Sequence, residues 1–432
     1  MITFSPYEHY QDSQISWLGK VPKHWNFKKA KYLFRKSKIP VRKQDGVVTA
    51  YRDGEVTLRT NRRAEGYTVA ILEQGYQGVR KGQLVINSMD AFAGAIGVSD
   101  SDGKCSPEYV VCDPVHSDEV EPRYYALLIR EMALRNYIQV ICPAVRQRAL
   151  RIRYNSLAPL FFPLPPCEEQ RRIVEFLDRK TAEIDDEIAT KQRLIELLQE
   201  QKAILINQAV TKGLDPNVSM RDSGVSWIND IPEKWTVLPL TKYVKSVVDY
   251  RGKTPTKVDS GVFLVTAKNI KNGSIDYEVS KEYVPENKYA EIMSRGSPKK
   301  NDLLFTTEAP LGGVALVDRE DIALAQRIIK FRLDEQYLDA RFTRYSMLSF
   351  YFQSFLSTEA TGSTAQGIKA SKLHKLKIIA PPIEEQEEIV EFIDQGLAQI
   401  NEIYERQQEI IDELINFRQI LIANSVTGKI KF

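Results

Sequence analysis

Two sequence motifs each occur twice in this chain, in the same order, and this repeat restricts the possible folds more than any other feature. The first motif reads SQISWLGKVPKHW over residues 13–25 and SGVSWINDIPEKW over residues 223–235. The second reads LPPCEEQRRIVEFLD over residues 164–178 and APPIEEQEEIVEFID over residues 380–394. Matches of this length in a fixed order predict a duplicated molecule with pseudo-two-fold symmetry, although duplication by itself assigns no function.

The repeat also predicts how the chain is divided. We expect globular domains at residues 1–164 and 225–380, each followed by a long helix, at residues 165–212 and 381–428. Residues 213–224, GLDPNVSMRDSG, have the composition of a loop and are expected to link the two halves. Because the globular segments differ strongly between the matching motifs, the pattern favours one scaffold that carries two different recognition surfaces.

Each Pro-Pro-x-Glu-Glu-Gln sequence predicts the start of a helix, because proline suits the first turn and acidic side chains there offset the helix dipole. Beyond this start, spacings of three and four residues alternate over five heptads in both copies, which predicts a coiled coil. Each helix of about 45 residues is then about 65 Å long. The hydrophobic seam positions are Val174, Leu177, Ile184, Ile188, Ile195, Leu198, Leu205, Val390, Ile393, Leu397, Ile400, Tyr404, Ile411, Leu414 and Leu421.

The seam also contains matching polar positions, Lys191 with Gln407 and Lys202 with Arg418. Such residues either fix the register of the two helices or extend out of the seam to solvent, and the sequence leaves both interpretations open. Parallel and antiparallel pairing are also both open, although the repeat favours the antiparallel form. In that form the helices would set the distance between the two globular domains.

The charges are segregated along the chain, although 60 basic and 57 acidic residues give 432 residues a net charge of only +3. Residues 20–63 contain fourteen basic residues against three acidic ones, and residues 144–153 contain four arginines and no acid. Residues 251–271 are also basic, whereas residues 384–413 contain eleven acids against one base. A single charged run is usually a solvated surface, but three basic runs in the globular segments favour binding to phosphates.

The basic segments contain side chains that suit the edges of bases. Arginine and lysine suit guanine, and asparagine and glutamine suit adenine, because those edges form two hydrogen bonds. The sequence does not separate contacts to bases from contacts to phosphates. The candidate DNA-binding residues are Tyr51, Arg59, Asn61, Arg62, Arg63, Arg146, Gln147, Arg148, Arg251, Lys253, Lys268, Asn269, Lys271, Thr307, Gln366 and Lys369.

Two further segments correspond, KGQLVINSMDAFAGAIGV at 81–98 and KNDLLFTTEAPLGGVALV at 300–317. Each predicts an apolar strand, a polar tip and a glycine-containing turn into a second strand. The tips either contact bases or are ordinary polar hairpin residues, and we favour the second interpretation. The tip residues are Ser88, Asp90, Thr307 and Glu308.

The sequence contains no motif typical of catalysis. There is no GxxxxGK[ST] phosphate loop, no GxGxxG after a strand and no HExxH, so we expect no catalytic residues. None of the four cysteines forms a CxxC pair, so we expect no metal site and no disulfide framework. There is no apolar run of 18 residues and no signal-peptide pattern at the N-terminus, so we expect a cytoplasmic protein with no membrane partner.

Together the duplicated motifs, FTTEAP at 305–310 and TGST at 361–364 leading into Ile368-Lys369 resemble the specificity subunit of a type I restriction–modification system. The resemblance spans essentially the whole chain. It implies an α+β protein whose domains 1–164 and 225–380 are target-recognition domains with mixed β-sheet cores. These domains would be separated by an antiparallel coiled coil and would each read one part of a bipartite sequence in double-stranded DNA.

The resemblance also implies partners that carry out the chemistry. Two methylation subunits would dock on the paired helices and use S-adenosylmethionine to methylate adenine, and restriction subunits would use ATP and Mg to translocate and cleave DNA. This chain would hold no cofactor. One departure concerns the first domain, where Arg146-Gln147-Arg148 stands in place of Gly362-Ser363-Thr364, so its loop is expected to contact DNA differently.

The alternative is a protein of a different class. A non-catalytic coiled-coil scaffold whose basic modules bind RNA or protein would have the same repeat and the same charge pattern. Binding to a defined, split DNA sequence would separate the two hypotheses.

Overall fold

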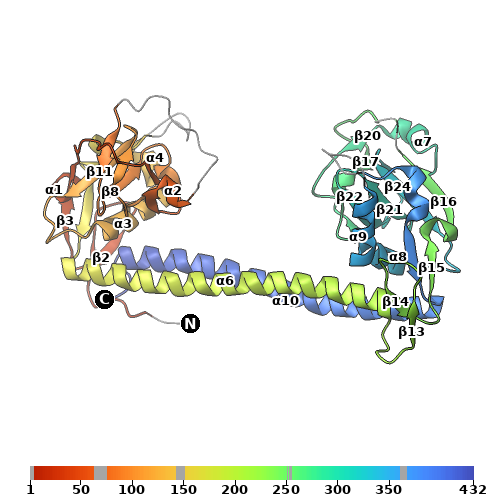
Figure 1. Cartoon of the computed structure of the whole chain (residues 1–432). Coiled ribbons are helices and arrows are strands. Elements are labelled where there is room, and N and C mark those ends of the chain that lie inside the picture. Colours follow the sequence, from red (N-terminus) through yellow and green to blue (C-terminus); the bar gives the residue numbers. More distant parts are fainter. Residues whose placement is uncertain (1–3, 63–74, 143–150, 251, 253–254, 361–366) are drawn as a thin grey trace. The chain divides into compact units, whose positions relative to one another are not determined.

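The structure is a computed structural model that describes residues 4–62, 75–142, 151–250, 252, 255–360 and 367–432 (Figure 1). The fold is mixed α+β and divides into two units. Unit 1 consists of Met1–Lys191 together with Glu409–Phe432, and unit 2 of Gln192–Gln408. Among the described helices, none is both long enough and apolar enough to cross a membrane.

The core of unit 1 is an antiparallel four-stranded sheet in the order β4-β11-β8-β9. The sequences of β8 (Leu84–Asn87) and β11 (Tyr109–Pro114) form apolar, largely β-branched runs, as expected for strands that are covered on both faces. Helix α3 (Pro122–Leu134) packs against this sheet and starts with proline, whose missing N–H costs nothing at that position.

Short elements surround the core sheet of unit 1. The remaining strands and helices are β1 (Tyr10–Asp12), β2 (Lys20–Pro22), β3 (Asn26–Lys29), α1 (Ala30–Leu33), β4 (Phe34–Lys36), β5 (Val48–Ala50), β6 (Val56–Leu58), α2 (Arg59–Arg62), β7 (Gln77–Val79), β9 (Ile96–Val98), β10 (Gly103–Cys105), α4 (Tyr137–Ile141), α5 (Tyr154–Leu157) and β12 (Phe161–Leu164).

Unit 2 has a core sheet with the same order of equivalent strands, β16-β24-β21-β22, which is also antiparallel. Helix α8 (Ala340–Leu348) packs against β22, and Asp339 caps it by accepting the amide of Phe342 at 2.8 Å. A second sheet, β20-β17-β23, contains a parallel pair between β17 and β23. The prediction of mixed sheets therefore holds for this second sheet, whereas both core sheets are antiparallel.

Unit 2 is also built mainly from short elements. They are β13 (Met220–Asp222), β14 (Asp230–Pro232), β15 (Thr236–Pro239), β16 (Val244–Asp249), β17 (Val262–Val265), β18 (Ile270–Lys271), β19 (Ser274–Ile275), β20 (Tyr283–Val284), α7 (Tyr289–Ile292), β21 (Leu303–Thr307), β22 (Leu311–Leu316), β23 (Ile322–Leu324), β24 (Ile328–Leu333), α9 (Phe350–Glu359) and β25 (Lys377–Ala380). Strand β13 lies inside the segment 213–224 predicted as a linker, because it pairs with β14.

Two long helices, α6 (Cys167–Lys212) and α10 (Ile383–Val426), contribute a segment to each unit. Within unit 1, Arg418 of α10 forms an ion pair with Asp185 of α6. Within unit 2, Lys202 of α6 donates to the side chain of Asn401 of α10. Also in unit 2, a Cβ on Gly396 of α10 would lie 2.6 Å from Leu205 of α6. The two segments in unit 2 therefore lie side by side in opposite directions.

The predicted seam residues of α6 and α10 are all buried or half-buried. The polar seam residues behave differently from one another. Lys202 and Arg418 contact the other helix, and the Lys202 ammonium also lies 5.1 Å from the centre of the Tyr404 ring. Lys191 instead pairs at 3.0 Å with Glu187, one turn earlier on its own helix. This contact fits the interpretation in which the side chain extends out of the seam.

The two repeated motifs contact each other in both units. The indole N–H of Trp25 donates to Glu169 at 2.9 Å, and that of Trp235 donates to Glu385 at 2.9 Å. Burial of the two tryptophans is nearly complete. The sequence predicted only a role at the helix start for these glutamates, whereas each also joins the helix to the globular part of its own unit.

The glutamine that follows each glutamate satisfies three backbone groups. Gln386 accepts the amide of Asp339 and donates to the carbonyls of Tyr337 and Pro381, each at 2.9 Å. Gln170 makes the equivalent contacts in unit 1, including the amide of Glu121 at 2.9 Å. Both side chains are fully buried, so no water replaces these bonds.

Residues 409–432 complete unit 1, although they come last in the chain. The Tyr124 hydroxyl donates to the carbonyl of Val426 at 2.9 Å, and the amide of Lys431 donates to the carbonyl of Ser5 at 2.9 Å. The ring of Phe432 packs edge-on against Phe176 of α6. The core of unit 1 therefore contains both ends of the described chain.

Candidate nucleic-acid interface

In both units the hairpin tip that follows β8 or β21 contacts the residues that come directly after an undescribed segment. In unit 1, Ser88 donates its hydroxyl to the carbonyl of Ile152 at 2.6 Å and its amide to the carbonyl of Glu108 at 3.1 Å. We call the three segments that meet here the loop junction of unit 1: the tip 88–90, the return 151–153 and the residue that precedes β11, Glu108.

The loop junction of unit 2 consists of the tip 307–309, the return 367–369 and the residue that precedes β24, Arg327. The amide of Thr307 donates to the carbonyl of Arg327 at 2.9 Å, and the amide of Ile368 donates to the carbonyl of Thr307 at 3.0 Å. The bond from the tip amide to the carbonyl of the residue before the next core strand is therefore common to both junctions, although that residue is Glu108 in one and Arg327 in the other.

Partly exposed ion pairs occupy both junctions. In unit 1 Arg151 pairs with Glu108 at 3.4 Å and Arg52 with Asp90 at 2.8 Å. In unit 2 Arg327 pairs with Glu308 at 2.9 Å. Pairs this exposed contribute at most about 1 kcal/mol to stability, so a DNA phosphate or base can replace one partner at little cost.

The predicted residues of the YRDGEVTLRTNRR segment form a compact cluster in unit 1. The guanidinium of Arg62 lies 4.2 Å from the centre of the Tyr51 ring and forms ion pairs with Asp53 and Glu55. Burial alone would raise the pKa of Asp53, but the hydrogen bonds from Arg62 and from the amide of Glu55, together with the nearby positive charges, outweigh it and lower that pKa. The Arg62 guanidinium is thus held in place by two acidic side chains that come earlier in the sequence, Asp53 and Glu55.

The two other described candidates of this segment contact neighbouring threonines. Arg59 Nε donates to Thr49 at 3.3 Å, and the Asn61 amide donates to Thr57 at 2.8 Å. Asn61 is exposed, so its carbonyl oxygen faces outward and its amide is the group that is engaged.

In unit 2, Lys268, Lys271 and Lys369 are exposed and meet the first requirement for a DNA contact. The structure corrects the prediction for Asn269, which is fully buried. Its oxygen accepts from Thr266 and its amide donates to the carbonyls of Asp276 and Ser280, so it has no group left for a base.

Thr307 is the second correction. Its side chain is almost completely buried, and its hydroxyl donates to the carbonyl of Arg327 at 3.2 Å. The interpretation of the tip as an ordinary polar hairpin position therefore holds for Thr307. Its neighbour Glu308 is partly exposed and carries the charge of this tip.

Seven of the predicted DNA-binding residues lie outside the described residues and stay predictions. They are Arg63, Arg146, Gln147, Arg148, Arg251, Lys253 and Gln366. The loop triplet Gly362-Ser363-Thr364 also lies outside them.

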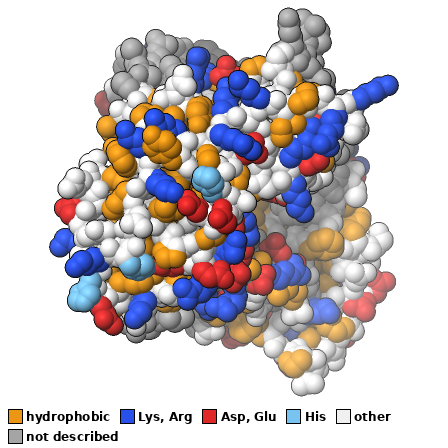
Figure 2. Space-filling model, turned by 90° about the vertical axis from the view of Figure 1, so that its left-hand side faces the viewer, with side chains coloured by type: hydrophobic (Ala, Val, Ile, Leu, Met, Phe, Trp, Pro, Cys, Tyr) orange, Lys and Arg blue, Asp and Glu red, His pale blue; other side chains and the backbone are white. Residues whose placement is uncertain are grey.

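Lysine and arginine side chains are spread over the face of unit 1 that Figure 2 shows, with hydrophobic side chains among them. The structure explains part of this mixture. The Lys29 and Lys31 ammonium groups lie 5.3 Å and 4.9 Å from the ring centres of Phe161 and Tyr32, two exposed aromatic residues. Other cations of the basic run 20–63 are paired with acids from outside the run, as Lys28 is with Glu119 at 2.5 Å.

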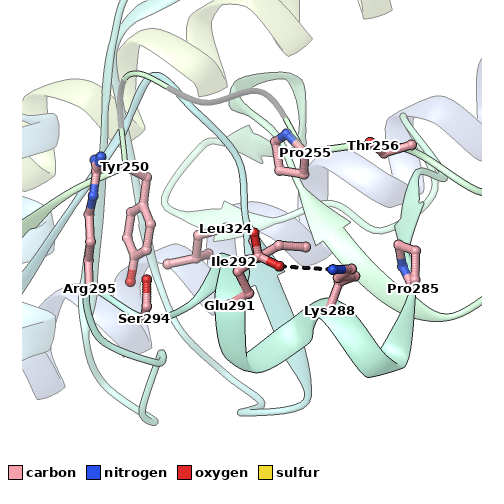
Figure 3. A pocket seen from close by; sticks show the side chains of 10 residues that line it. All are labelled: Tyr250, Pro255, Thr256, Pro285, Lys288, Glu291, Ile292, Ser294, Arg295 and Leu324. Carbon is pink, nitrogen blue, oxygen red and sulfur yellow. Dashed lines mark hydrogen bonds and ion pairs between the residues drawn. The ribbon is translucent and has the colours of Figure 1, made fainter.

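A cavity of about 330 Å³ opens in unit 2 beside Tyr250 (Figure 3). Tyr250, Ile292 and Leu324 line it together with the pair Lys288–Glu291, whose charged atoms are 3.1 Å apart. Burial raises the pKa of Tyr250, so its hydroxyl stays protonated and donates to the carbonyl of Gly296. Tyr250 and the Lys288–Glu291 pair therefore each have a partner within the protein, which is typical of side chains with a structural role.

Across the described part of the chain, no group of three or more histidine, cysteine, aspartate or glutamate side chains is placed to hold a metal ion. Burial raises the pKa of Cys105 and Cys112 to about 12, so both stay as thiols and are poor nucleophiles at neutral pH. All four cysteines are free.

Comparison with known proteins finds similarity to one family. The family model for the type I restriction modification DNA specificity domain matches residues 233–413. The putative type I restriction enzyme MjaX specificity subunit of Methanocaldococcus jannaschii is 23% identical over 100% of this chain and 99% of that protein. The chain is thus similar, over its whole length, to a type I restriction enzyme specificity subunit.

A second relative and a solved structure are also similar to this chain. The type I restriction enzyme MjaVIII specificity subunit of Methanocaldococcus jannaschii is 28% identical over 62% of this chain and 62% of that protein, so this match spans less than two thirds of either. A chain from a study of complex assembly and conformational transition of the type I R-M system has a TM-score of 0.67. It is 18% identical and covers 95% of this chain and 99% of that one, which shows a shared fold.

Proposed function

We propose that this chain is the DNA-recognition subunit of a type I restriction–modification complex and that it binds a bipartite sequence in double-stranded DNA. The observation that carries the proposal is the pair of loop junctions. In both, the amide of the tip donates to the carbonyl of the residue that precedes the next core strand, but this residue is Glu108 before β11 and Arg327 before β24. One scaffold that presents different side chains at equivalent positions is suited to reading two different half-sites.

In this proposal residues 1–164 and 225–380 are the target-recognition domains, joined through residues 213–224. The helical segments 165–212 and 381–428 form an antiparallel coiled coil, which is supported by the opposite directions of the two segments in unit 2 and by the burial of the seam. Glu169 and Glu385 make equivalent contacts in their own units, and so do Gln170 and Gln386. These equivalent contacts support an internal duplication.

The partners are two methylation subunits and the restriction subunits, and the chain itself is not catalytic. Several large apolar side chains on α6 and α10 point away from the seam and offer a surface for methylation subunits. They include Leu197, Ile204, Phe392 and Ile403, which are 44%, 54%, 47% and 46% exposed. S-adenosylmethionine, ATP and Mg belong to the partner subunits, and the complex works in the cytoplasm.

The test is binding by the assembled complex of this chain with its methylation subunits. Cognate and scrambled duplexes are compared over a salt titration, after the target is found by mapping methylated adenines in cells that carry the complex. A split target bound at least about 1,000-fold more tightly than scrambled DNA supports the proposal. Equal binding of all duplexes, or preferential binding of RNA, would instead support the scaffold hypothesis.

A further inference from the structure

The residue that directly precedes β11 in unit 1 and β24 in unit 2 differs in charge. It is Glu108 in unit 1 and Arg327 in unit 2. In unit 1 residues 106–108 join β10 to β11, and in unit 2 residues 325–327 join β23 to β24. Glu108 and Arg327 each bond through the carbonyl to the amide of the hairpin tip. This one backbone hydrogen bond is shared, whereas the backbone conformations differ, because only Arg327 of the two has a positive φ.

Arg327 is held in an unfavourable backbone conformation. Its φ is +78°, in the left-handed region, where a long side chain is disfavoured relative to glycine. Its carbonyl accepts both the amide and the hydroxyl of Thr307, which maintains this conformation. Glycine would meet the backbone requirement more easily, so an arginine here points to a use for the guanidinium.

The guanidinium of Arg327 is both exposed and held. Its side chain is 46% exposed, and its Nε lies 2.9 Å from Glu308 Oε1, whose side chain is 43% exposed. Glu308 forms a β-bridge with Gly367, so this pair lies beside the return segment 367–369 of the loop junction. A weak, solvent-exposed pair orders the arginine and still releases it to a stronger acceptor.

We propose that Arg327 is a specificity-determining residue that reads a guanine in the half-site bound by unit 2, an inference that rests on the proposed function. The planar guanidinium donates two hydrogen bonds to O6 and N7 of guanine in the major groove, a pattern that the other three bases lack. Glu308 is a positioning residue that orients the guanidinium before DNA arrives. Unit 1 carries Glu108 at the equivalent position and reads its own half-site differently.

The test uses the complex of this chain with its methylation subunits and a duplex library that is randomised across both half-sites. Bound sequences are recovered for the wild type and for Arg327→Gln, Arg327→Lys and Glu308→Gln. Arg341→Gln is the matched control, because Arg341 is similarly exposed at 47% and also pairs with acids, but on α8. Thermal unfolding of each variant checks that unit 2 stays folded.

We expect Arg327→Gln to lose about 5- to 150-fold of the preference for guanine at one base pair of one half-site, and to leave the other half-site unchanged. Arg327→Lys loses much of the same preference, because lysine keeps the charge but lacks the two-pronged geometry. Glu308→Gln is expected to weaken the preference less than Arg327→Gln does, because it removes the orienting carboxylate and keeps the guanidinium, and Arg341→Gln is expected to keep the preference.

Two results would overturn the inference while leaving the proposed function intact. An unchanged base preference in Arg327→Gln would show that the residue does not read sequence. Weaker binding of all sequences alike, with a salt dependence reduced by about one counterion, would show a phosphate contact instead. A wild-type library without any split motif would contradict the proposed function itself.

Discussion

At the scale of single residues, the most informative side chains are those that join one repeated motif to the other. Trp235 and Glu385 are 150 residues apart in sequence and form a hydrogen bond in the structure. The sequence marked both residues as parts of a repeat, but it did not show that they touch. A repeat records which residues recur, whereas their contacts depend on the tertiary fold.

Replacing Gln386 with alanine is expected to destabilise unit 2 by about 3 kcal/mol, because the amide of Asp339 and two carbonyls lose their buried partner. Urea unfolding followed by far-UV circular dichroism measures the change. Glu384→Ala, at an exposed position two residues earlier, is the control and is expected to have little effect. Equal effects of the two variants would contradict the structural role of Gln386.

A buried charge cluster in unit 2 predicts a dependence of stability on pH. Asp302 lies 3.0 Å from the ammonium of Lys330, which is 1% exposed, and 2.7 Å from Arg332. Burial alone would raise the pKa of Asp302, but the hydrogen bonds from Arg332, from the amide of Lys299 and from Lys330 outweigh it and lower the pKa. The equivalent position in unit 1 holds the uncharged Gln83, which donates to Asp113 at 2.7 Å.

Because the pKa of Asp302 is lower in the folded state, its contribution to stability is complete above the unfolded pKa of about 4 and is lost as the pH falls through the folded pKa. Asp302→Asn is therefore expected to destabilise unit 2 by about 3 kcal/mol or more at pH 7, since it leaves a buried lysine without its counter-charge. The difference from wild type is expected to shrink below about pH 4. Urea unfolding between pH 3 and pH 7 measures it, with Asp321→Asn, an exposed aspartate, as the control. A difference that is constant over this range would argue against the cluster.

At the scale of elements, the long helices were the most predictable part of the fold. Five heptads of uninterrupted spacing decide the helical period, and the predicted starts at 165 and 381 lie two residues before α6 and α10. The short strands were less predictable, because two or three residues carry too little periodicity. Strand β13 inside the expected linker is an example, since only its pairing with β14 makes it a strand.

Two neighbouring residues of α10 separate the seam from the outward surface. Ile393 is completely buried in the core of unit 2, whereas Phe392 is 47% exposed. Ile393→Ala is expected to cost about 3 kcal/mol of stability, because it removes a packed side chain and leaves a cavity. Phe392→Ala is expected to change stability by less than about 0.5 kcal/mol.

The same pair tests the proposed docking of methylation subunits. We expect Phe392→Ala to weaken binding of a methylation subunit by about tenfold or more, as for an aromatic residue at the centre of an interface. Calorimetric titration of the purified subunits gives the affinity. An unchanged affinity would move the docking surface away from this part of α10.

At the scale of the whole molecule, the small net charge concealed a segregation that the sequence did reveal. Acidic residues gather on the second helix and basic residues in the globular segments. The structure adds that a basic run in sequence is not a bare cation cluster in space, because Lys28 and Arg42 meet acids from distant segments. The candidate interface was therefore only partly predictable: exposed lysines such as Lys271 remain, and buried Asn269 and Thr307 drop out.

The proposed coiled coil makes a prediction about the spacing of the DNA target. Inserting one heptad into each helix, near residues 195 and 404, keeps the seam in register and adds about 10 Å. The spacer between the half-sites is then expected to lengthen by about three base pairs, with both half-sites unchanged. Mapping methylated adenines in cells that carry the variant measures the spacer. An insertion of the same length in the loop at 215–217 is the control, and an unchanged spacer in the helix variant would refute the spacing role.

The chain order of unit 1 has a consequence for how the protein is made. Unit 2 is one continuous stretch, 192–408, but unit 1 needs residues 409–432, whose Leu421, Val426 and Ile430 lie in its core. At about 5–20 residues per second, a ribosome adds these residues roughly 10–40 s after it has passed residue 191. Throughout that interval the first-made half of the molecule carries an open apolar face, so it depends on chaperones while the later half can already fold.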